Sequence, residues 1–170
     1  MQTEHVTHIF DPVYDKKSRI LVLGTFPSVK SREVSFYYGH PQNRFWKVLA
    51  ALTEKEFPKT IEEKKRLLLE NGVAIWDVIA SCDIQGSSDS SIKNVVPNDI
   101  AKIVGEIPDI TVFANGEKAF SLYQKYCKEQ TGKEIIKLPS TSPANAAYSL
   151  EKLTEIWGEE FYRTGWKKNG

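Results

Sequence analysis

Residues 20–28 read Ile-Leu-Val-Leu-Gly-Thr-Phe-Pro-Ser, and this stretch decides the class of fold. Its first four residues form an apolar run without polar alternation, as expected for a strand that is covered on both faces in a parallel sheet. The Gly-Thr-Phe-Pro-Ser that follows has the composition of a turn. We therefore expect a buried parallel strand over 20–23 with a loop at its carboxyl end.

Three further apolar runs resemble the first, at residues 73–76, 110–113 and 135–138. Each follows a stretch with helical spacing, so that strands and helices alternate along the chain, as is typical of α/β folds. The sequence predicts an α/β fold of three layers, an α/β/α sandwich in which helices cover a central four-stranded, mainly parallel sheet.

Residues that commonly start or end helices mark the segments between these strands. Thr60 and Glu63 match a capping box, which predicts a helix over 61–70 that ends before Gly72. Apolar residues at helical spacing predict a final helix over 150–161.

Two more helices are expected in the second half of the chain. Pro97 fits the first position of a helix that runs to Val104. Asn115 is expected to cap the next helix, which Gly132 closes.

Four loops are expected to meet at the carboxyl edge of the predicted sheet: residues 24–28, 81–94, 115–116 and 139–145. The segment 81–94 is too polar for a core and is interpreted as one long loop. In open α/β sheets, ligands bind beyond the carboxyl ends of the strands. The sequence therefore predicts one ligand crevice at this edge.

Length and composition indicate a globular protein with one domain over residues 1–170. The chain is 41% hydrophobic and 26% charged, and it is long enough to bury a core without metal or disulfide support. No apolar run approaches the ~18 residues of a membrane span, so no membrane partner is expected. A net charge of +1 argues against a protein that coats nucleic acid through charge alone, so any nucleic-acid site must be local.

The start of the chain and its cysteines indicate a cytoplasmic protein. No basic segment followed by an apolar block, as in a secretory signal, is visible there. Cys82 and Cys127 form no Cys-x-x-Cys pair, so we expect reduced structural thiols and no zinc site. His5 and His8 are interpreted as a tolerated terminal pair rather than metal ligands.

Two further segments contain the candidate chemistry. Residues 36–46 read Phe-Tyr-Tyr-Gly-His-Pro-Gln-Asn-Arg-Phe-Trp and bring aromatic rings and an amide above the first strand. Residues 138–145 read Leu-Pro-Ser-Thr-Ser-Pro-Ala-Asn, where Pro143 fits the first position of a helix whose free N–H groups suit a phosphate. An ordinary helix cap without a ligand is the alternative. The common dinucleotide, nucleoside-triphosphate, esterase and zinc-protease motifs are absent.

Together with residues 24–28, these two segments resemble the motifs of the uracil-DNA glycosylase superfamily. The resemblance is strongest to its hypoxanthine-DNA glycosylase branch, followed by the mismatch-specific uracil/thymine glycosylases. The string His-Pro-Gln-Asn-Arg-Phe-Trp at 40–46 is its most specific part. Residues 109–118 and the helix after them are also similar to the family, so the resemblance covers most of the chain. It implies the fold of that superfamily and a DNA N-glycosylase that needs no cofactor and no metal.

For catalysis, the resemblance points to Asn43. The mismatch-specific branch has a catalytic Asn where this chain has Phe26, and the catalytic Asp of the classical uracil enzymes is also missing. The hypoxanthine branch is similar in lacking both, and its catalytic Asn corresponds to Asn43, with His40 as the second candidate. An amide is no base near neutral pH, so we expect the Asn43 carbonyl to orient the attacking water.

The resemblance also implies base-binding and DNA-binding residues. Tyr38 aligns with the family's stacking position. Phe26, a ring in place of an amide, is expected either to close the other face of the base or to widen the preference toward a purine. The remaining base-binding candidates lie in the turn whose backbone N–H groups would stabilise the departing base. They are Gly24, Thr25, Pro27 and Ser28. The DNA-binding candidates are expected to bind flanking phosphates (Ser140, Thr141 and Ser142) or to enter the gap left in the helix (Pro143, Ala144 and Asn145). Asn145 is also a candidate to pair with the widowed base.

The other residues of the most specific string have plainer interpretations. Phe45 and Trp46 are interpreted as core residues rather than DNA contacts. For Arg44, a place on a helix surface, an ion pair and a phosphate contact all stay open.

The sequence is thus interpreted as a monofunctional DNA glycosylase that hydrolyses the N-glycosidic bond of a deaminated base flipped out of DNA, with hypoxanthine favoured. Its expected partner is double- or single-stranded DNA that contains such a base, and the protein is expected to act as a monomer in base excision repair. The alternatives are a uracil- or mismatch-specific glycosylase, a non-catalytic nucleic-acid-binding module of the same fold, and a hydrolase of free nucleosides or nucleotides.

Overall fold

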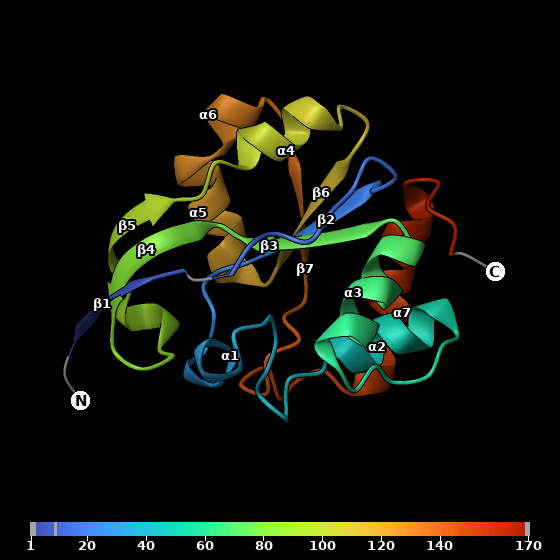
Figure 1. Ribbon diagram of the computed structural model, residues 1–170, viewed down its shortest axis with the longest axis horizontal. Helices are drawn as coiled ribbons and strands as arrows, with labels where there is room; N and C mark the ends of the chain where they lie inside the picture. The colour runs from blue at the N-terminus through green and yellow to red at the C-terminus, as the bar shows by residue number, and fades with distance from the viewer. Residues whose placement is uncertain (1–2, 9, 169–170) are drawn as a thin grey trace.

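The computed structural model describes residues 3–8 and 10–168. Its centre is a parallel sheet whose strands lie in the order β3-β2-β6-β7 (Figure 1). These strands are β2 (Ile20–Gly24), β3 (Val73–Asp77), β6 (Thr111–Asn115) and β7 (Ile135–Leu138). All three pairings are parallel, which confirms the predicted four-stranded sheet. β6 lies slightly further along the chain than the predicted 110–113.

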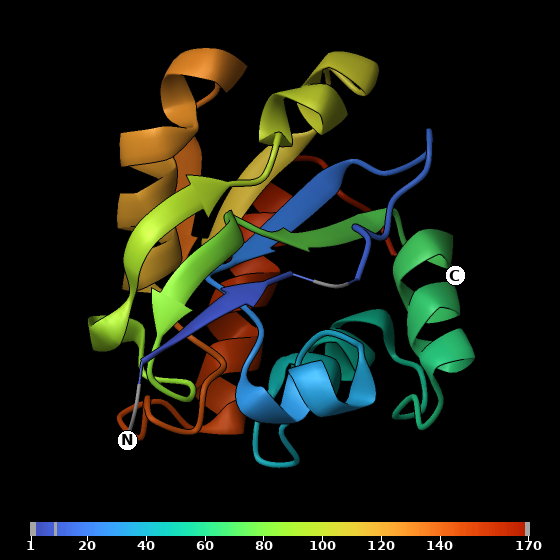
Figure 2. The ribbon, with the colours of Figure 1, turned by 60° about the vertical axis from the view of Figure 1, so that its left-hand side comes forward.

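Both faces of this sheet are covered, which explains why its strands are apolar without alternation. Ile20 and Val22 pack into one buried cluster, whereas Leu21 and Leu23 pack into a second cluster on the opposite face. The first face is covered by α2 (Phe45–Thr53), α3 (Ile61–Glu70) and α7 (Leu150–Arg163). The second face is covered in part by α4 (Ile100–Glu106) and α5 (Glu117–Tyr126). Figures 1 and 2 show these two groups of helices on either side of the sheet, which confirms the α/β class and its layers.

The helix limits that rest on clear end signals agree with the structure. In α3, Thr60 and Glu63 form both hydrogen bonds of the predicted capping box, and Gly72 has the left-handed φ of 67° that suits a residue after a helix. The helix that follows β6 is broken near Cys127 into α5 and a short α6 (Lys128–Thr131), which Gly132 closes in a left-handed conformation. Helix α1 (Val29–Val34) was not expected and lies between the first two motif segments.

A second, antiparallel sheet is the main difference from the sequence-based expectation. It has the order β1-β4-β5 and consists of β1 (Glu4–Thr7), β4 (Ile79–Ile84) and β5 (Lys93–Pro97). The expectation of one long loop over 81–94 is therefore wrong at both ends. Cys82 and Ile84 are buried, whereas the alternating residues Ser81 and Asp83 are only partly covered. β4 therefore buries one face only, and its polar residues hid it from a search for apolar runs.

Two predicted helix starts are also wrong. Pro97 ends β5, where its missing N–H costs nothing at the last ladder position, and α4 begins only at Ile100. Residues 139–149 contain no helix, so Pro143 opens none, and α7 begins after Ser149, whose hydroxyl accepts a hydrogen bond from the Lys152 N–H. The phosphate site that we expected at Pro143 therefore lacks the free N–H groups of a helix N-terminus.

Two further observations concern the described part of the chain as a whole. None of its helices is both long and apolar enough to cross a membrane. Cys82 and Cys127 are buried free thiols, as expected.

Candidate functional site

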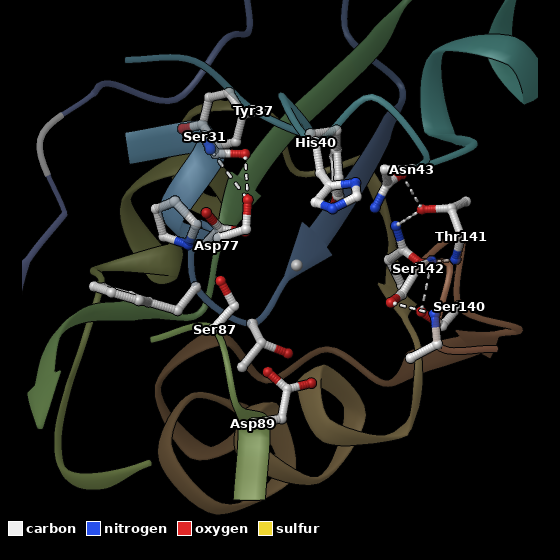
Figure 3. A pocket seen from close by; sticks show the side chains of 18 of the residues that line it. Ser31, Tyr37, His40, Asn43, Asp77, Ser87, Asp89, Ser140, Thr141 and Ser142 are labelled. Atoms are coloured by element: carbon white, nitrogen blue, oxygen red, sulfur yellow. Dashed lines mark hydrogen bonds between the residues drawn. The ribbon is translucent and has the colours of Figure 1, made fainter. Parts of the chain in front are cut away.

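A pocket of about 350 Å³ lies at the carboxyl edge of the parallel sheet (Figure 3). Residues from all four expected loops line it, although only Ser87 and Asp89 come from the segment 81–94. Of the predicted site residues, the lining contains Gly24, Thr25, Phe26, Pro27, Ser28, Tyr38, His40, Asn43, Ser140, Thr141, Ser142, Pro143 and Ala144. Asn145 is not among them. The structure thus brings segments that are far apart in the sequence around one cavity.

The hydrogen bonds of Asn43 define which of its atoms faces this cavity. Its Oδ1 accepts one hydrogen bond from the Phe45 backbone N–H (2.9 Å) and one from the Thr141 hydroxyl (2.8 Å). A carbonyl oxygen has two lone pairs, so neither is left to hold a water. The amide NH₂ remains for the pocket. The expected role of the Asn43 carbonyl in orienting water therefore does not fit these contacts.

Thr141 ties Asn43 to the end of strand β6. The Thr141 hydroxyl accepts a hydrogen bond from Asn115 Nδ2 (3.0 Å), and the Thr141 backbone N–H donates to Asn115 Oδ1 (3.0 Å). Asn115 therefore does not cap α5, because the N-cap position is taken by Gly116, which has no side chain that could accept a hydrogen bond. Because Thr141 is fully buried and its polar groups are used internally, it is not free to bind the phosphate that we expected.

His40 presents a second N–H group from the same wall. Its Nδ1 accepts a hydrogen bond from the Gln42 backbone N–H (3.1 Å). In the neutral ring the proton is then on Nε2, which makes Nε2 a donor. In Figure 3, His40 and Asn43 lie on one side of the cavity, across from Asp77 and Asp89. The N–H groups of His40 and Asn43 thus lie on one side of the cavity, which we call the donor wall, and the two carboxylates lie on the other side with the Ser87 hydroxyl.

Tyr38 is held in an unusual conformation. Its φ of 54° is left-handed, which is rare for a bulky residue and costs on the order of 1–3 kcal/mol. Its ring stacks on Phe45, with ring centroids 4.2 Å apart. Within the described residues its buried hydroxyl makes no hydrogen bond of ordinary geometry. Burial, followed by the negative charge of Asp77, raises the pKa of Tyr38 above its usual value, and an interaction with the Asn115 side chain opposes this rise.

Sequence reasoning missed Asp77 and His8, which form a buried pair at the pocket. His8 Nε2 donates to Asp77 Oδ2 over 2.8 Å, and the two side chains are 3% and 5% exposed. A Cβ atom on Gly24 would lie 2.4 Å from Asp77 Oδ1, so glycine is required there. His8 is therefore not a loose terminal residue, whereas His5 forms an exposed bond to Asp83 as its position suggested.

A signal in the sequence could have revealed Asp77, because it directly follows the predicted strand 73–76 at the edge where ligands bind. Nothing local indicates His8, which reaches the site only because β1 pairs with β4.

Asp89 and Phe26 complete the walls. Desolvation by the surrounding protein raises the pKa of Asp89; the charge of Lys118 opposes this shift, and the smaller effect of the Asp77 charge adds to it. The Phe26 ring lines the pocket with the Arg32 guanidinium 5.8 Å from its centroid. Ser28 uses its hydroxyl to cap α1 by accepting from the Ser31 N–H.

The loop 139–149 is exposed at its tip and fixed at its base. Pro143 and Ala144 are exposed. The Asn145 amide donates to the Ser140 carbonyl (3.0 Å), so this side chain is engaged within the loop. Within the described residues, no group of three or more His, Cys, Asp or Glu side chains is arranged to hold a metal ion.

Comparison with known proteins gives consistent matches over most of the chain. The family model of the uracil DNA glycosylase superfamily matches residues 12–159. A Methanosarcina acetivorans protein named hypoxanthine DNA glycosylase is 33% identical over 148 residues, which are 86% of this chain and 92% of that protein. A protein of the same name from Methanosarcina barkeri is 32% identical over 157 residues, which are 91% of this chain and 97% of that protein.

One solved structure is also similar. The solution NMR structure of a candidate uracil DNA glycosylase from Methanosarcina acetivorans superposes with a TM-score of 0.77 at 31% identity. The match covers 92% of this chain and 96% of that chain.

Proposed function

The chain belongs to the uracil DNA glycosylase superfamily, and on this premise we propose that it is a monofunctional enzyme that excises hypoxanthine from DNA in base excision repair. The two relatives named hypoxanthine DNA glycosylase support this choice of base, since each aligns with most of this chain. The observation that carries the proposal is the pocket in which the three motif segments meet, with the Asn43 amide NH₂ free to face a ligand.

The reaction requires stabilisation of the departing base. The bond between C1′ of the sugar and the base nitrogen breaks, the electron pair leaves with the base, and water adds to C1′ and loses a proton to solvent. Negative charge develops on the base as the glycosidic bond lengthens, so hydrogen-bond donors that are held against the base lower the activation barrier. We assign this role to Asn43 Nδ2, with His40 Nε2 as a second donor on the same wall.

Tyr38 is proposed to stack on the flipped base. An enzyme that acts on a base must take it out of the duplex, and stacking contributes ~1–3 kcal/mol toward the cost of unstacking. Phe45 supports one face of the Tyr38 ring, and the strained backbone of Tyr38 is of the kind that persists at functional sites. Phe26 is proposed as the other wall.

Asp77 is proposed to recognise what deamination changes. Deamination converts an amine to a carbonyl and leaves a proton on the neighbouring ring nitrogen, so hypoxanthine has a ring N–H where adenine has a bare nitrogen. A carboxylate only accepts hydrogen bonds. Because His8 occupies Oδ2, Oδ1 is the atom proposed to accept this N–H.

The DNA contacts are proposed to come from the loop 139–149. The hydroxyls of Ser140 and Ser142 lie at the pocket and suit flanking phosphates, and the exposed Pro143 and Ala144 suit the gap left by the flipped base. We further propose that residues 1–170 act as one domain, as a monomer and in the cytoplasm. The free buried thiols are consistent with a reducing compartment.

A panel of lesions tests this function. Matched duplex and single-stranded oligonucleotides with one hypoxanthine, uracil or xanthine are incubated with the protein and then treated with alkali. We expect cleavage at hypoxanthine only after alkali, since a monofunctional enzyme leaves the abasic strand intact. Faster excision of uracil would transfer the assignment to uracil. Cleavage of no lesion would contradict an enzymatic role of this chain. Hydrolysis of free deoxyinosine at a rate similar to that on DNA would favour a nucleosidase.

A further inference from the structure

The contacts of Arg44 extend over almost the whole loop 139–149. Its Nη2 donates to the carbonyls of Ser142 (2.9 Å) and Asn145 (3.0 Å), and its Nη1 donates to that of Tyr148. Its Nε and its backbone N–H both donate to the Thr141 carbonyl, at 3.4 and 3.0 Å. One guanidinium thus joins four backbone carbonyls of a segment that has no helix or strand of its own.

These contacts decide between the three roles that the sequence left open for Arg44. A guanidinium has five N–H donors, and four of them are used here on uncharged carbonyls. A bidentate phosphate contact would therefore require at least one of these bonds to break. No carboxylate within the described residues forms an ion pair with Arg44.

Arg44 also connects the loop to the proposed catalytic amide. It directly follows Asn43, and both residues bond to Thr141: Arg44 through the Thr141 carbonyl, and Asn43 through the Thr141 hydroxyl. A displacement of the loop would therefore move the hydroxyl that fixes the Asn43 amide.

We propose that Arg44 is a positioning residue that holds residues 141–148 in the shape required for DNA entry and that couples this shape to the orientation of Asn43. The DNA role of the loop rests on the proposed function, whereas the ordering of the loop does not. Ordering a loop before binding removes an entropic cost that would otherwise weaken the complex. Lysine cannot replace this residue, because an ammonium group cannot span four carbonyls.

The test uses Arg44→Lys, which keeps the charge, and Arg44→Gln, which removes it. Amide hydrogen exchange of residues 141–148 is measured without DNA, and excision of hypoxanthine from duplex DNA is measured with it. We expect faster exchange in this segment and a loss of about 100-fold in kcat/KM in both variants, as small misplacements of reacting groups produce. Lys47→Gln is the control for exchange, because it changes an exposed residue of α2, the helix that begins directly after Arg44.

Salt dependence separates positioning from a phosphate contact. We expect Arg44→Gln to weaken binding to duplex product DNA without changing the slope of log Kd against log salt concentration. A slope smaller by about 0.9 would indicate a lost phosphate contact and overturn the proposal. Unchanged loop exchange in both variants would also overturn it. If the wild-type protein excises no base, the proposed function fails, but the exchange result still decides whether Arg44 orders the loop.

Discussion

The orientation of one amide, that of Asn43, determines what chemistry this residue can perform. The Phe45 backbone N–H can only donate, so it fixes Oδ1 on its side and directs the NH₂ to the cavity. The sequence identified the residue but not this orientation, because the second partner, Thr141, lies far along the chain. Without the Thr141 hydroxyl, Asn43 Oδ1 would keep a lone pair that could hold a water. This tertiary contact therefore decides that Asn43 acts on the pocket as a donor.

Two substitutions of Tyr38 should distinguish its proposed stacking on the base from the energetic cost of burying its hydroxyl. Tyr38→Phe keeps the ring and removes a buried hydroxyl that makes no hydrogen bond of ordinary geometry within the described residues. Burying such a hydroxyl costs ~1–3 kcal/mol. We expect a higher free energy of unfolding in urea with excision retained. Tyr38→Ala should weaken binding of lesion DNA by about 5- to 150-fold, the equivalent of one lost stack. Full activity of Tyr38→Ala would remove this residue from the base site.

Asp77 can be tested through the proton that it is proposed to recognise. A methyl group in 1-methylhypoxanthine replaces the ring N–H, so the wild-type protein should excise this base far more slowly than hypoxanthine. A hydrogen bond to a charged group contributes ~1.5–3 kcal/mol, so Asp77→Ala should narrow the ratio of the two rates by about 10-fold or more. Asp83→Ala, a carboxylate of β4 outside the pocket, is the control. An unchanged ratio in Asp77→Ala would mean that another group recognises the base.

At the scale of elements, the close approach between the end of β2 and Asp77 requires a residue without a side chain, Gly24. A Cβ on Gly24 would meet Asp77 Oδ1 at 2.4 Å, whereas a Cβ on Gly105 in α4 would meet nothing within 4 Å. We expect Gly24→Ala to lower the free energy of unfolding by about 1–3 kcal/mol and to reduce excision, since the buried carboxylate must move. Gly105→Ala should be neutral or stabilising, because alanine favours helices. Equal stability of the two variants would contradict the close approach at Gly24.

The elements also show how far sequence reasoning reaches. Runs such as 20–23 were recognised because a strand buried on both faces is apolar at every position. β4 was missed because it buries one face only, and its Ser81 and Asp83 resemble a loop. The pocket residues that lie in the sequence motifs, from Gly24 to Asn43 and from Ser140 to Ala144, could be predicted from local patterns. His8 could not, because it reaches the pocket through a strand pairing that no local pattern reveals.

At the scale of the whole molecule, stability should decrease in alkali through a buried thiol. Burial raises the pKa of Cys127 to about 11 from an ordinary value of 9.0. The folded state therefore holds this proton more tightly than the unfolded state, and the stability it contributes is complete below pH 9 and is lost as the pH rises through about 11. We expect the unfolding free energy of the wild-type protein, relative to Cys127→Ala, to fall over this range in urea titrations. A constant difference would contradict the shift.

At the scale of the whole molecule, the fold places the N–H groups of His40 and Asn43 across one pocket from the carboxylates of Asp77 and Asp89 (Figure 3). The pocket lies at the edge of a sheet in which β2 is one of the two inner strands. Loop 139–149 comes from the far end of the chain, yet it fixes the amide on the donor wall through Thr141. In the mechanism that we propose, catalysis depends on the partial positive charge that the N–H groups of this donor wall present to the departing base.

Asn43→Asp tests this dependence most directly. Aspartate keeps an oxygen for the Phe45 N–H and the Thr141 hydroxyl, so the variant changes only the group that faces the pocket, from a donor to an anionic acceptor. Single-turnover rates of hypoxanthine release from duplex DNA are compared with those of the wild-type protein. We predict a loss of at least ~10²–10³-fold, the effect of removing one donor to a developing anion. A rate equal to or above that of the wild-type protein would show that residue 43 acts as an acceptor that holds water, and would contradict this mechanism.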